Sequence, residues 1–308
     1  MAVASGCRGL RTLREEPHVD MSASGPMYEQ AGQPQAPGAQ ATPHPVPGSA
    51  EDPLTDAMRI ARGAVEAGIG LKLLGGLGVR VVCPDYPPRL RRDQDIDFAC
   101  MSKERKAVAA HLEKVGCAPD RRFNNLNGDR QMYFTAPSGR PIDVMVDKLT
   151  MCHTLDFRPS FRKLPYTVDV VDLLLSKLQI VELNEKDARD IVQLLSCMPI
   201  ARAAAGGSGG RPPGQHGDGL AIDADRFGAV LGADWGWWRT VTANLDKIPR
   251  LLAERPQLAQ PGMPFDPAAQ AARLRELADA TPKSMKWRMR AGVGEKVRWY
   301  ELPEEVGH

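Results

Sequence analysis

The chain has 308 residues, of which 43% are hydrophobic and 25% charged, and 40 Lys and Arg against 38 Asp and Glu give a net charge of +2. These proportions are typical of a globular protein and exclude collagen-like, coiled-coil and wholly disordered chains. No run reaches the roughly 20 apolar residues that a membrane helix needs, so we expect no membrane partner. The composition itself names no function.

The cysteines favour a reduced, cytoplasmic protein. They are Cys7, Cys83, Cys100, Cys117, Cys152 and Cys197. No two of them form a CxxC pair, which disfavours a zinc ribbon. A chain of this length can bury a core without disulfides, and its first ten residues lack the apolar segment of a signal peptide. We therefore expect free thiols and a cytoplasmic location.

Residues 1–52 are rich in Ala, Gly, Pro, Ser and Gln and show no periodicity. Such a segment buries too little apolar surface to offset its ordering entropy, so we predict a disordered tail. Residues 201–220 contain a Gly- and Pro-rich run, which predicts a flexible linker.

Between these segments the sequence predicts a mixed α/β fold that becomes helical. The predicted elements are a helix from about Pro53, a strand at 71–74, a helix, a strand at 95–100, a helix capped by Ser102 and ending near Val115, and strands at 130–135 and 141–146. Beyond Tyr166 helices follow, with Thr167 and Asn184 as caps of the first two and further helices around 238–248 and 271–278. Residues 221–308 form a helical C-terminal region in this prediction.

Acidic side chains on two of these predicted strands are the candidate functional residues. Alternate residues of a strand share a face, so Asp95 and Asp97 point one way, and Asp143 and Asp147 share a face of the later strand. If the two strands are neighbours, three or four carboxylates meet in one patch. Like charges that close raise each other's pKa unless a cation lies between them, and clustered oxygen ligands suit Mg²⁺ or Mn²⁺.

The Gly75-Gly76 pair that follows the first strand fits the same kind of site. Glycines allow the backbone to approach a phosphate closely and direct N–H groups at it. The segment lacks the third small residue of a dinucleotide fingerprint and the Gly-Lys-Ser/Thr ending of a Walker loop, so neither of those motifs is predicted.

Taken together, LLGGLGVRVVCP, RRDQDIDF and IDVMVD resemble the nucleotidyltransferase superfamily with the DNA polymerase β-type fold, and within it the AbiEii toxin-like branch. Asp95 and Asp97 match the metal-binding pair of that family and Asp143 its third carboxylate. Arg91 stands at the arginine of the branch's Arg-x-Thr-x-Asp-Ile-Asp strand. The later segment DLLLSKLQIVELNEKDARDI matches the branch's helical motif through Lys177, Lys186, Asp187 and Asp190. The likeness covers about residues 55–197.

The resemblance implies a mixed-sheet catalytic core at 53–150 and a helical segment at 151–200 that completes the nucleotide site. It implies Mg²⁺ or Mn²⁺ held by Asp95, Asp97 and Asp143, which are the catalytic residues. An NTP substrate would be held by Gly75, Gly76, Arg91, Lys177, Lys186, Asp187 and Asp190. The reaction would transfer a nucleoside monophosphate to a hydroxyl or amine of RNA, protein or a small molecule. An antitoxin would be the partner if the chain is a toxin.

Other interpretations of the same residues stay open. The chain could keep the fold as a non-catalytic nucleotide- or RNA-binding protein. Lys177 could extend to the surface, and Asp187 could merely complete a capping box with Asn184. His153 is expected to be structural. The basic and aromatic run near the C-terminus could bind RNA, but packing of its tryptophans is the favoured interpretation.

Overall fold

The computed structural model describes residues 52–88, 94–202 and 219–302. Apart from Asp52, the predicted tail lies outside the described residues, as do Arg91 and most of the predicted 201–220 linker. The main elements are α1 (Pro53–Glu66), β1 (Leu71–Leu73), α2 (Gly75–Val82), β2 (Ile96–Cys100), α3 (Arg105–Lys114), β3 (Ala118–Pro119), α4 (Arg121–Asn127), β4 (Gln131–Thr135), β5 (Pro141–Val146), β6 (Lys148–Thr150), β7 (Thr154–Asp156), α5 (Val170–Leu178), α6 (Glu185–Cys197), β8 (Ile200–Ala201), β9 (Ile222–Asp223), α7 (Ala224–Ala233), α8 (Trp235–Glu254), α9 (Pro267–Ala280) and α10 (Met285–Val293).

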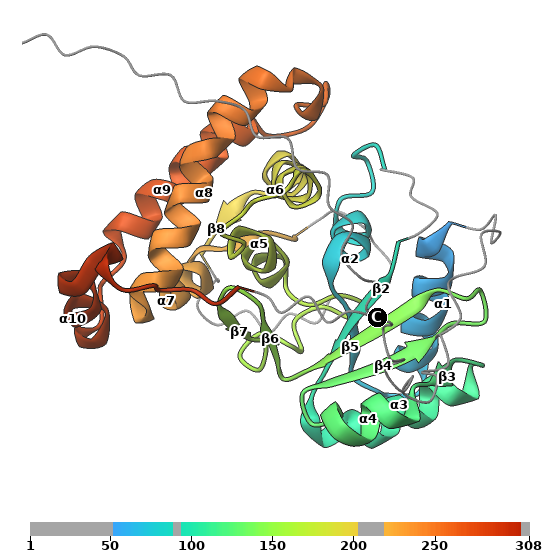
Figure 1. Cartoon of the computed structure of the whole chain (residues 1–308). Coiled ribbons are helices and arrows are strands. Elements are labelled where there is room, and N and C mark those ends of the chain that lie inside the picture. The colour runs from blue at the N-terminus through green and yellow to red at the C-terminus, as the bar shows by residue number, and fades with distance from the viewer. Residues whose placement is uncertain (1–51, 89–93, 203–218, 303–308) are drawn as a thin grey trace, which may run out of the picture. The chain divides into compact units, whose positions relative to one another are not determined.

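A five-stranded mixed sheet is the centre of the first half, with the strand order β1-β2-β5-β4-β3. The pairing of β2 with β5 is parallel, and the other pairs in this sheet are antiparallel. Mostly helical structure follows β7, as Figure 1 shows. The predicted fold class, a mixed sheet followed by a helical C-terminal region, is therefore confirmed. The predicted domain boundaries within it stay predictions.

The two faces of the sheet differ in chemistry. Ile96 and Phe98 of β2 and Ile142 and Val144 of β5 are buried in one apolar core with side chains of α1 and α3. Because successive residues of a strand alternate between faces, Asp97 and Asp143 lie on the opposite face. The alternation in the sequence thus predicted correctly which side of the strands is polar.

Two predicted helix caps are wrong, and the predicted cap at Asn184 is confirmed. The Asn184 side chain accepts a hydrogen bond from the backbone N–H of Asp187. Ser102 instead begins a short 3₁₀ turn, and its own N–H donates to Oδ1 of Asp147. Asp169, not Thr167, caps α5, because Thr167 pairs with Leu73 at the edge of the sheet. Both errors arise from contacts with distant residues, which local sequence does not contain.

A second apolar core joins α5 and α6 to α7, α8 and α9, and it also takes in Val79 of α2 and Ala99 of β2. Trp237 and Trp238 pack there, and the Trp238 and Trp287 rings meet edge to face at 5.4 Å. The cysteines at 83, 100, 117, 152 and 197, which belong to the described residues, are all free. In the described ranges no helix has the length and apolarity to cross a membrane.

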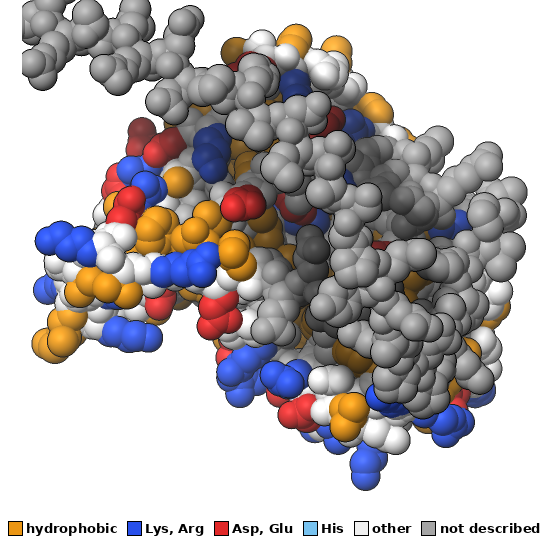
Figure 2. All heavy atoms as spheres, viewed as in Figure 1, with side chains coloured by type: hydrophobic (Ala, Val, Ile, Leu, Met, Phe, Trp, Pro, Cys, Tyr) orange, Lys and Arg blue, Asp and Glu red, His pale blue; other side chains and the backbone are white. Residues whose placement is uncertain are grey.

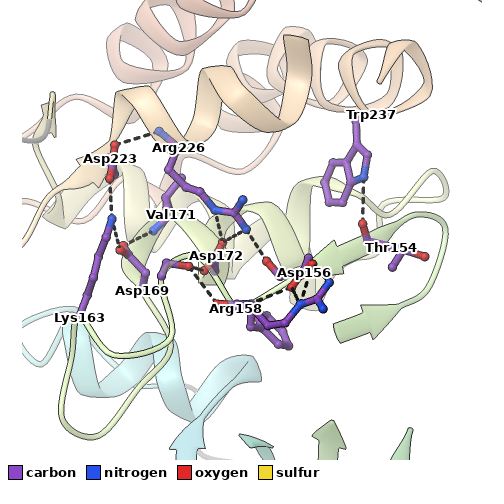
Figure 3. A network of polar contacts seen from close by, with 12 residues as sticks. Thr154, Asp156, Arg158, Lys163, Asp169, Val171, Asp172, Asp223, Arg226 and Trp237 are labelled. Carbon is purple, nitrogen blue, oxygen red and sulfur yellow. Dashed lines mark hydrogen bonds and ion pairs between the residues drawn. The ribbon is translucent and has the colours of Figure 1, made fainter. Parts of the chain in front are cut away.

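A buried ion pair ties α7 to α5 (Figure 3). Asp172 is fully buried on α5, and its Oδ1 accepts from Nε and Nη2 of Arg226 on α7 at 3.2 and 3.1 Å. Ser160 donates to the other carboxylate oxygen. Arg226 also donates to the backbone oxygen of Asp156 at 2.5 Å, which brings the end of β7 into the same network. Burial raises the pKa of Asp172 to about 6, although Arg226 and Ser160 act in the opposite direction.

Arg226→Ala should lower the free energy of unfolding by about 3–5 kcal/mol, because it leaves the Asp172 carboxylate buried without its cation. The double variant Asp172→Asn/Arg226→Met should recover much of this loss, since both charges are then absent. Urea denaturation of the three proteins measures the difference. A loss below about 1 kcal/mol in Arg226→Ala, the size found for exposed pairs, would contradict this account of the network.

His153 should make the fold sensitive to acid. Its Nε2 lies 2.8 Å from Oγ1 of Thr240 on α8, and burial lowers its pKa from 6.5 to about 4. Between pH 6.5 and 4 the unfolded chain therefore binds a proton at this residue that the folded chain does not. Stability is fully present above pH 6.5 and falls as the pH is lowered to about 4, by about 3 kcal/mol from this residue.

His153→Gln removes the titrating group while it keeps a polar side chain. Urea denaturation at pH 7, 5.5 and 4 should show that the wild type loses about 3 kcal/mol more than this variant over that range. Parallel pH profiles of the two proteins would show that His153 is not the source.

Candidate active site

The predicted carboxylates meet where β2 and β5 pair. Asp97 lies directly opposite Asp143 in the parallel register, so the two side chains leave the same face of adjacent strands. Asp95 precedes β2 and lines the same cavity as Asp97. Burial, then the charge of Asp143, and to a smaller extent that of Asp95, raise the pKa of Asp97 to about 6, while Lys177 acts against them. Asp97 thus lies within electrostatic reach of both Asp143 and Asp95.

The side chains of these carboxylates are not close enough together to hold a metal ion in this arrangement. Within the part of the chain that the structure describes, no three acidic, histidine or cysteine side chains are grouped closely enough to hold an ion. Asp143 is turned toward β4, where its Oδ1 accepts from Nε2 of Gln131 at 2.5 Å. The donor types suit a hard divalent cation, and the repulsion at Asp97 is what such a cation would relieve. Metal binding by all three would require their side chains to rotate.

Gly75 and Gly76 bring the start of α2 against this patch. Gly75 has a φ of +62°, and a Cβ there would collide with Oδ2 of Asp97 and lie 3.0 Å from its Cγ. At Gly76 a Cβ would lie 2.9 Å from Nε2 of Gln94. No side chain caps the first turn of α2. The glycines therefore allow the backbone at the start of α2 to lie directly against the Asp97 carboxylate and the Gln94 amide.

A small cavity of about 130 Å³ lies at this point. It is lined by Gly76, Arg80, Gln94, Asp95, Asp97, Lys177, Lys186, Arg189, Asp190 and Gln193. Its carboxylates come from β2, from Asp95 just before that strand and from α6, and its cations come from α2, α5 and α6. The helices that supply them, α2, α5 and α6, pack against one another (Figure 1). A cavity with both signs of charge can accept an anionic ligand together with a cation.

Lys177 is held inside the protein and does not extend to the surface. Its Nζ lies 2.9 Å from Oδ1 of Asp187 and 2.9 Å from Oδ2 of Asp190. Burial disfavours the charged amine, but Asp190 and Asp187 outweigh it and raise the pKa of Lys177. Lys177 is therefore a fixed cation at the wall of the cavity. Asp187 contacts Asn184 in the cap and also pairs with Lys177, so the capping interpretation is confirmed and a role in nucleotide binding stays a prediction.

Four lining residues are not predicted from the sequence: Arg80, Gln94, Arg189 and Gln193. On α6, Arg189 and Gln193 lie on the same helix face as the predicted Lys186 and Asp190, at the i, i+3, i+4, i+7 spacing, and this signal could have identified both. Arg189 also donates to the backbone oxygen of Pro87 at 2.6 Å.

Arg80 lies one turn after Gly76 on α2 and makes two bonds to Asp52, at 2.8 and 2.7 Å. Those bonds hold the pKa of Asp52 below its usual value, against the effect of burial. Asp52, which the sequence assigned to the tail, therefore belongs to the ordered structure. No local pattern pairs Asp52 with Arg80, because the contact joins two helices.

A larger cavity of about 660 Å³ lies elsewhere, between β7, α7, α8 and residues 298–301. Three of its polar side chains are already used in the fold. Arg226 binds Asp172, His153 lies against Thr240, and Arg290 donates to the backbone oxygens of Gly294 and Val297. The smaller cavity, where Asp95 and Asp97 lie beside the start of α2, is the better candidate site.

The contact between Gly75 and Asp97 gives a prediction with a built-in control. Gly68 also has a positive φ, +69°, but a Cβ there meets nothing within 4 Å. Gly68→Ala should cost about 1–2 kcal/mol for the backbone conformation alone, and Gly75→Ala should cost more because the carboxylate must move. In an Asp97→Ala background the extra cost should disappear. Urea denaturation measures each step, and equal costs at the two glycines would contradict the contact.

No protein-family model matches the chain, and no curated protein matches it. Among solved structures, one described as "putative nucleotidyltransferase from H. pylori" aligns with 78% of this chain and 96% of its own, at 9% identity and a TM-score of 0.31. A similarity of this size identifies neither an activity nor a substrate. Any assignment of function therefore depends on the residues of the cavity.

Proposed function

We propose that this chain is a metal-dependent nucleotidyltransferase, which moves a nucleoside monophosphate from an NTP to a hydroxyl or amine acceptor and releases pyrophosphate. One observation supports this most. The parallel register places Asp97 beside Asp143, with Asp95 next to them, at the glycine-rich start of α2. Paired strand carboxylates beside backbone that can receive phosphates are the parts that such a transfer needs.

Asp95, Asp97 and Asp143 are the residues that would hold the divalent cation, Mg²⁺ or Mn²⁺. Oxygen ligands of this kind suit both ions. The bound cation would supply charge neutralisation at the phosphates during the transfer. The raised pKa of Asp97 supports this assignment, because it reflects burial and repulsion from Asp143 and Asp95.

The phosphates would lie between the start of α2 and the polar face of α6. Gly75 and Gly76 offer backbone N–H groups, and the N-terminus of a helix favours negative charge. Lys186 and Arg189 line the opposite wall. Lys177 adds a cation whose charge is shared with Asp187 and Asp190. Arg91, outside the described residues, remains a proposed phosphate contact.

In the transfer, the acceptor oxygen forms a bond to the α-phosphorus as the bond from that phosphorus to the bridging oxygen breaks. Pyrophosphate leaves with the bonding electrons, and the acceptor proton passes to a base. Asp143 is our candidate for that base, and its carboxylate would turn from Gln131 toward the acceptor. RNA, a protein and a small molecule all remain acceptors in this proposal. An RNA acceptor would fit a toxin that is paired with an antitoxin.

A second candidate is a nucleotide- or RNA-binding protein that keeps the fold without catalysis. Two observations favour it: the carboxylates of the described residues are not grouped as a finished metal site, and Lys177 is already held by two aspartates. The two candidates differ in whether a covalent product forms.

The test is transfer of label from each NTP, supplied with Mg²⁺ and either total RNA or cell lysate. We expect label from the α-phosphate in the acceptor, label from the γ-phosphate in pyrophosphate, and loss of both on addition of EDTA. Asp95→Ala/Asp97→Ala should lower transfer by at least about 100-fold, the usual effect of losing a preorganised charged group. The matched control is Asp129→Ala/Asp225→Ala, which removes two exposed carboxylates and should leave transfer unchanged.

Transfer that survives Asp95→Ala/Asp97→Ala would place the reaction outside this cavity. Saturable NTP binding without any transfer would select the non-catalytic candidate. Label from the γ-phosphate in the acceptor would indicate a kinase and would also contradict the proposal.

A further inference from the structure

Exposed apolar side chains concentrate in one segment of the chain. Five of the six large apolar side chains that are exposed in the described residues belong to 285–302: Met285, Met289, Val293, Val297 and Leu302. The sixth, Leu126, is on α4. Single exposed apolar residues are ordinary, but a cluster of them marks a contact surface.

Three of the five form a seam along α10. Met285, Met289 and Val293 are spaced i, i+4 and i+8, which places them on one side of the helix. Met285 is 79% exposed and Met289 72% exposed. We call these three residues the α10 seam.

Contacts on the other side of α10 fix the direction of the seam. The Trp287 ring packs against Trp238 of α8, and the Arg290 guanidinium lies 4.8 Å from the centre of the Trp235 ring. At the start of the helix, Ser284 caps Trp287 and donates to the backbone oxygen of Ala233. These contacts hold one side of α10 on α7 and α8, so the seam faces away from the protein.

The seam is bordered by positive charge. Lys286 and Arg288 flank it on the two sides, and Lys296 and Arg298 follow the helix. Lys286 is 83% exposed, and its ion pair with Asp234 is long, at 3.9 Å. Glu295 is the sole acidic residue from 282 to 300, and it already binds Arg239 at 2.5 Å. Figure 2 shows basic and apolar side chains side by side over α10.

We propose that the α10 seam docks an acidic amphipathic helix of a partner protein. An apolar seam with a basic residue on each side and two more just beyond the helix is complementary to a helix whose apolar seam lies between glutamates or aspartates. Methionine suits such a surface because its flexible side chain adapts to the partner. Residues of α10 do not line the carboxylate cavity, so this proposal is independent of the proposed function.

Other occupants fit these observations less well. A second copy bound through the same face would place Lys286 and Arg288 against their own symmetry mates, and that repulsion opposes a symmetric dimer. RNA would use the charges but not the exposed methionines. A lipid surface remains a distinguishable outcome, because it too would bind a basic amphipathic helix.

The probe is a synthetic helical peptide of about three heptads with leucine at its seam and glutamate on both flanks. A matched peptide carries lysine in place of every glutamate. Fluorescence anisotropy with the full chain should show binding of the acidic peptide only. Met285→Ser/Met289→Ser should weaken it at least about tenfold. Leu126→Ser, which alters an equally exposed side chain outside the seam, should leave binding unchanged.

A variant with reversed charges distinguishes loss of the binding surface from misfolding, because it should gain a new ligand. Lys286→Glu/Arg288→Glu should lose the acidic peptide and gain the lysine peptide, which a misfolded protein would not do. Equal binding of the acidic peptide to all variants would overturn the proposal. Binding to phosphatidylglycerol vesicles or to a poly-uridine oligonucleotide, without binding of the acidic peptide, would assign the surface to lipid or RNA and would overturn it as well.

Discussion

The parallel pairing of β2 with β5 is the constraint on which the candidate site depends. It places Asp97 opposite Asp143, and the alternation of the strands turns both carboxylates away from the apolar core. A shift of one residue between these strands would move one carboxylate into that core. The apolar partners Ile96, Phe98, Ile142 and Val144 resist such a shift, because each would have to leave the core. Core packing on one face therefore fixes the arrangement of charge on the other.

Much of the fold could be predicted from the sequence because its signals are local. Alternation identified β2 and β5, apolar spacing identified the long helices, and Asn184 was recognised as a cap. The caps at Ser102 and Thr167 were wrong because remote groups decide them: Asp147 receives the N–H of Ser102, and Thr167 pairs with β1. Such contacts follow from the tertiary fold, and no local pattern encodes them.

The residues of the candidate site also fall into two groups, those that the sequence predicts and those that it does not. The three strand carboxylates and the glycine pair could be identified because residue type and spacing were informative. The fixed position of Lys177 could not, since a lysine on an apolar helix has the same sequence pattern whether its amine reaches solvent or pairs with aspartates of a neighbouring helix. Gln131 was missed because a single glutamine on a strand has no distinctive pattern. Its contact with Asp143 depends on the pairing of β4 with β5.

The order of strands in the sheet also constrains how the protein can assemble. β5 is the last of the five strands to leave the ribosome, yet it occupies the middle position between β2 and β4. The sheet therefore cannot grow outward from a finished centre as the chain is synthesised. β4 and β5 are close in the sequence and can pair first as a hairpin. This hairpin must then pair with β2, which is far from β5 in the sequence. Until that attachment, a nascent chain displays an unpaired β2 edge, which makes this stage the most exposed to aggregation.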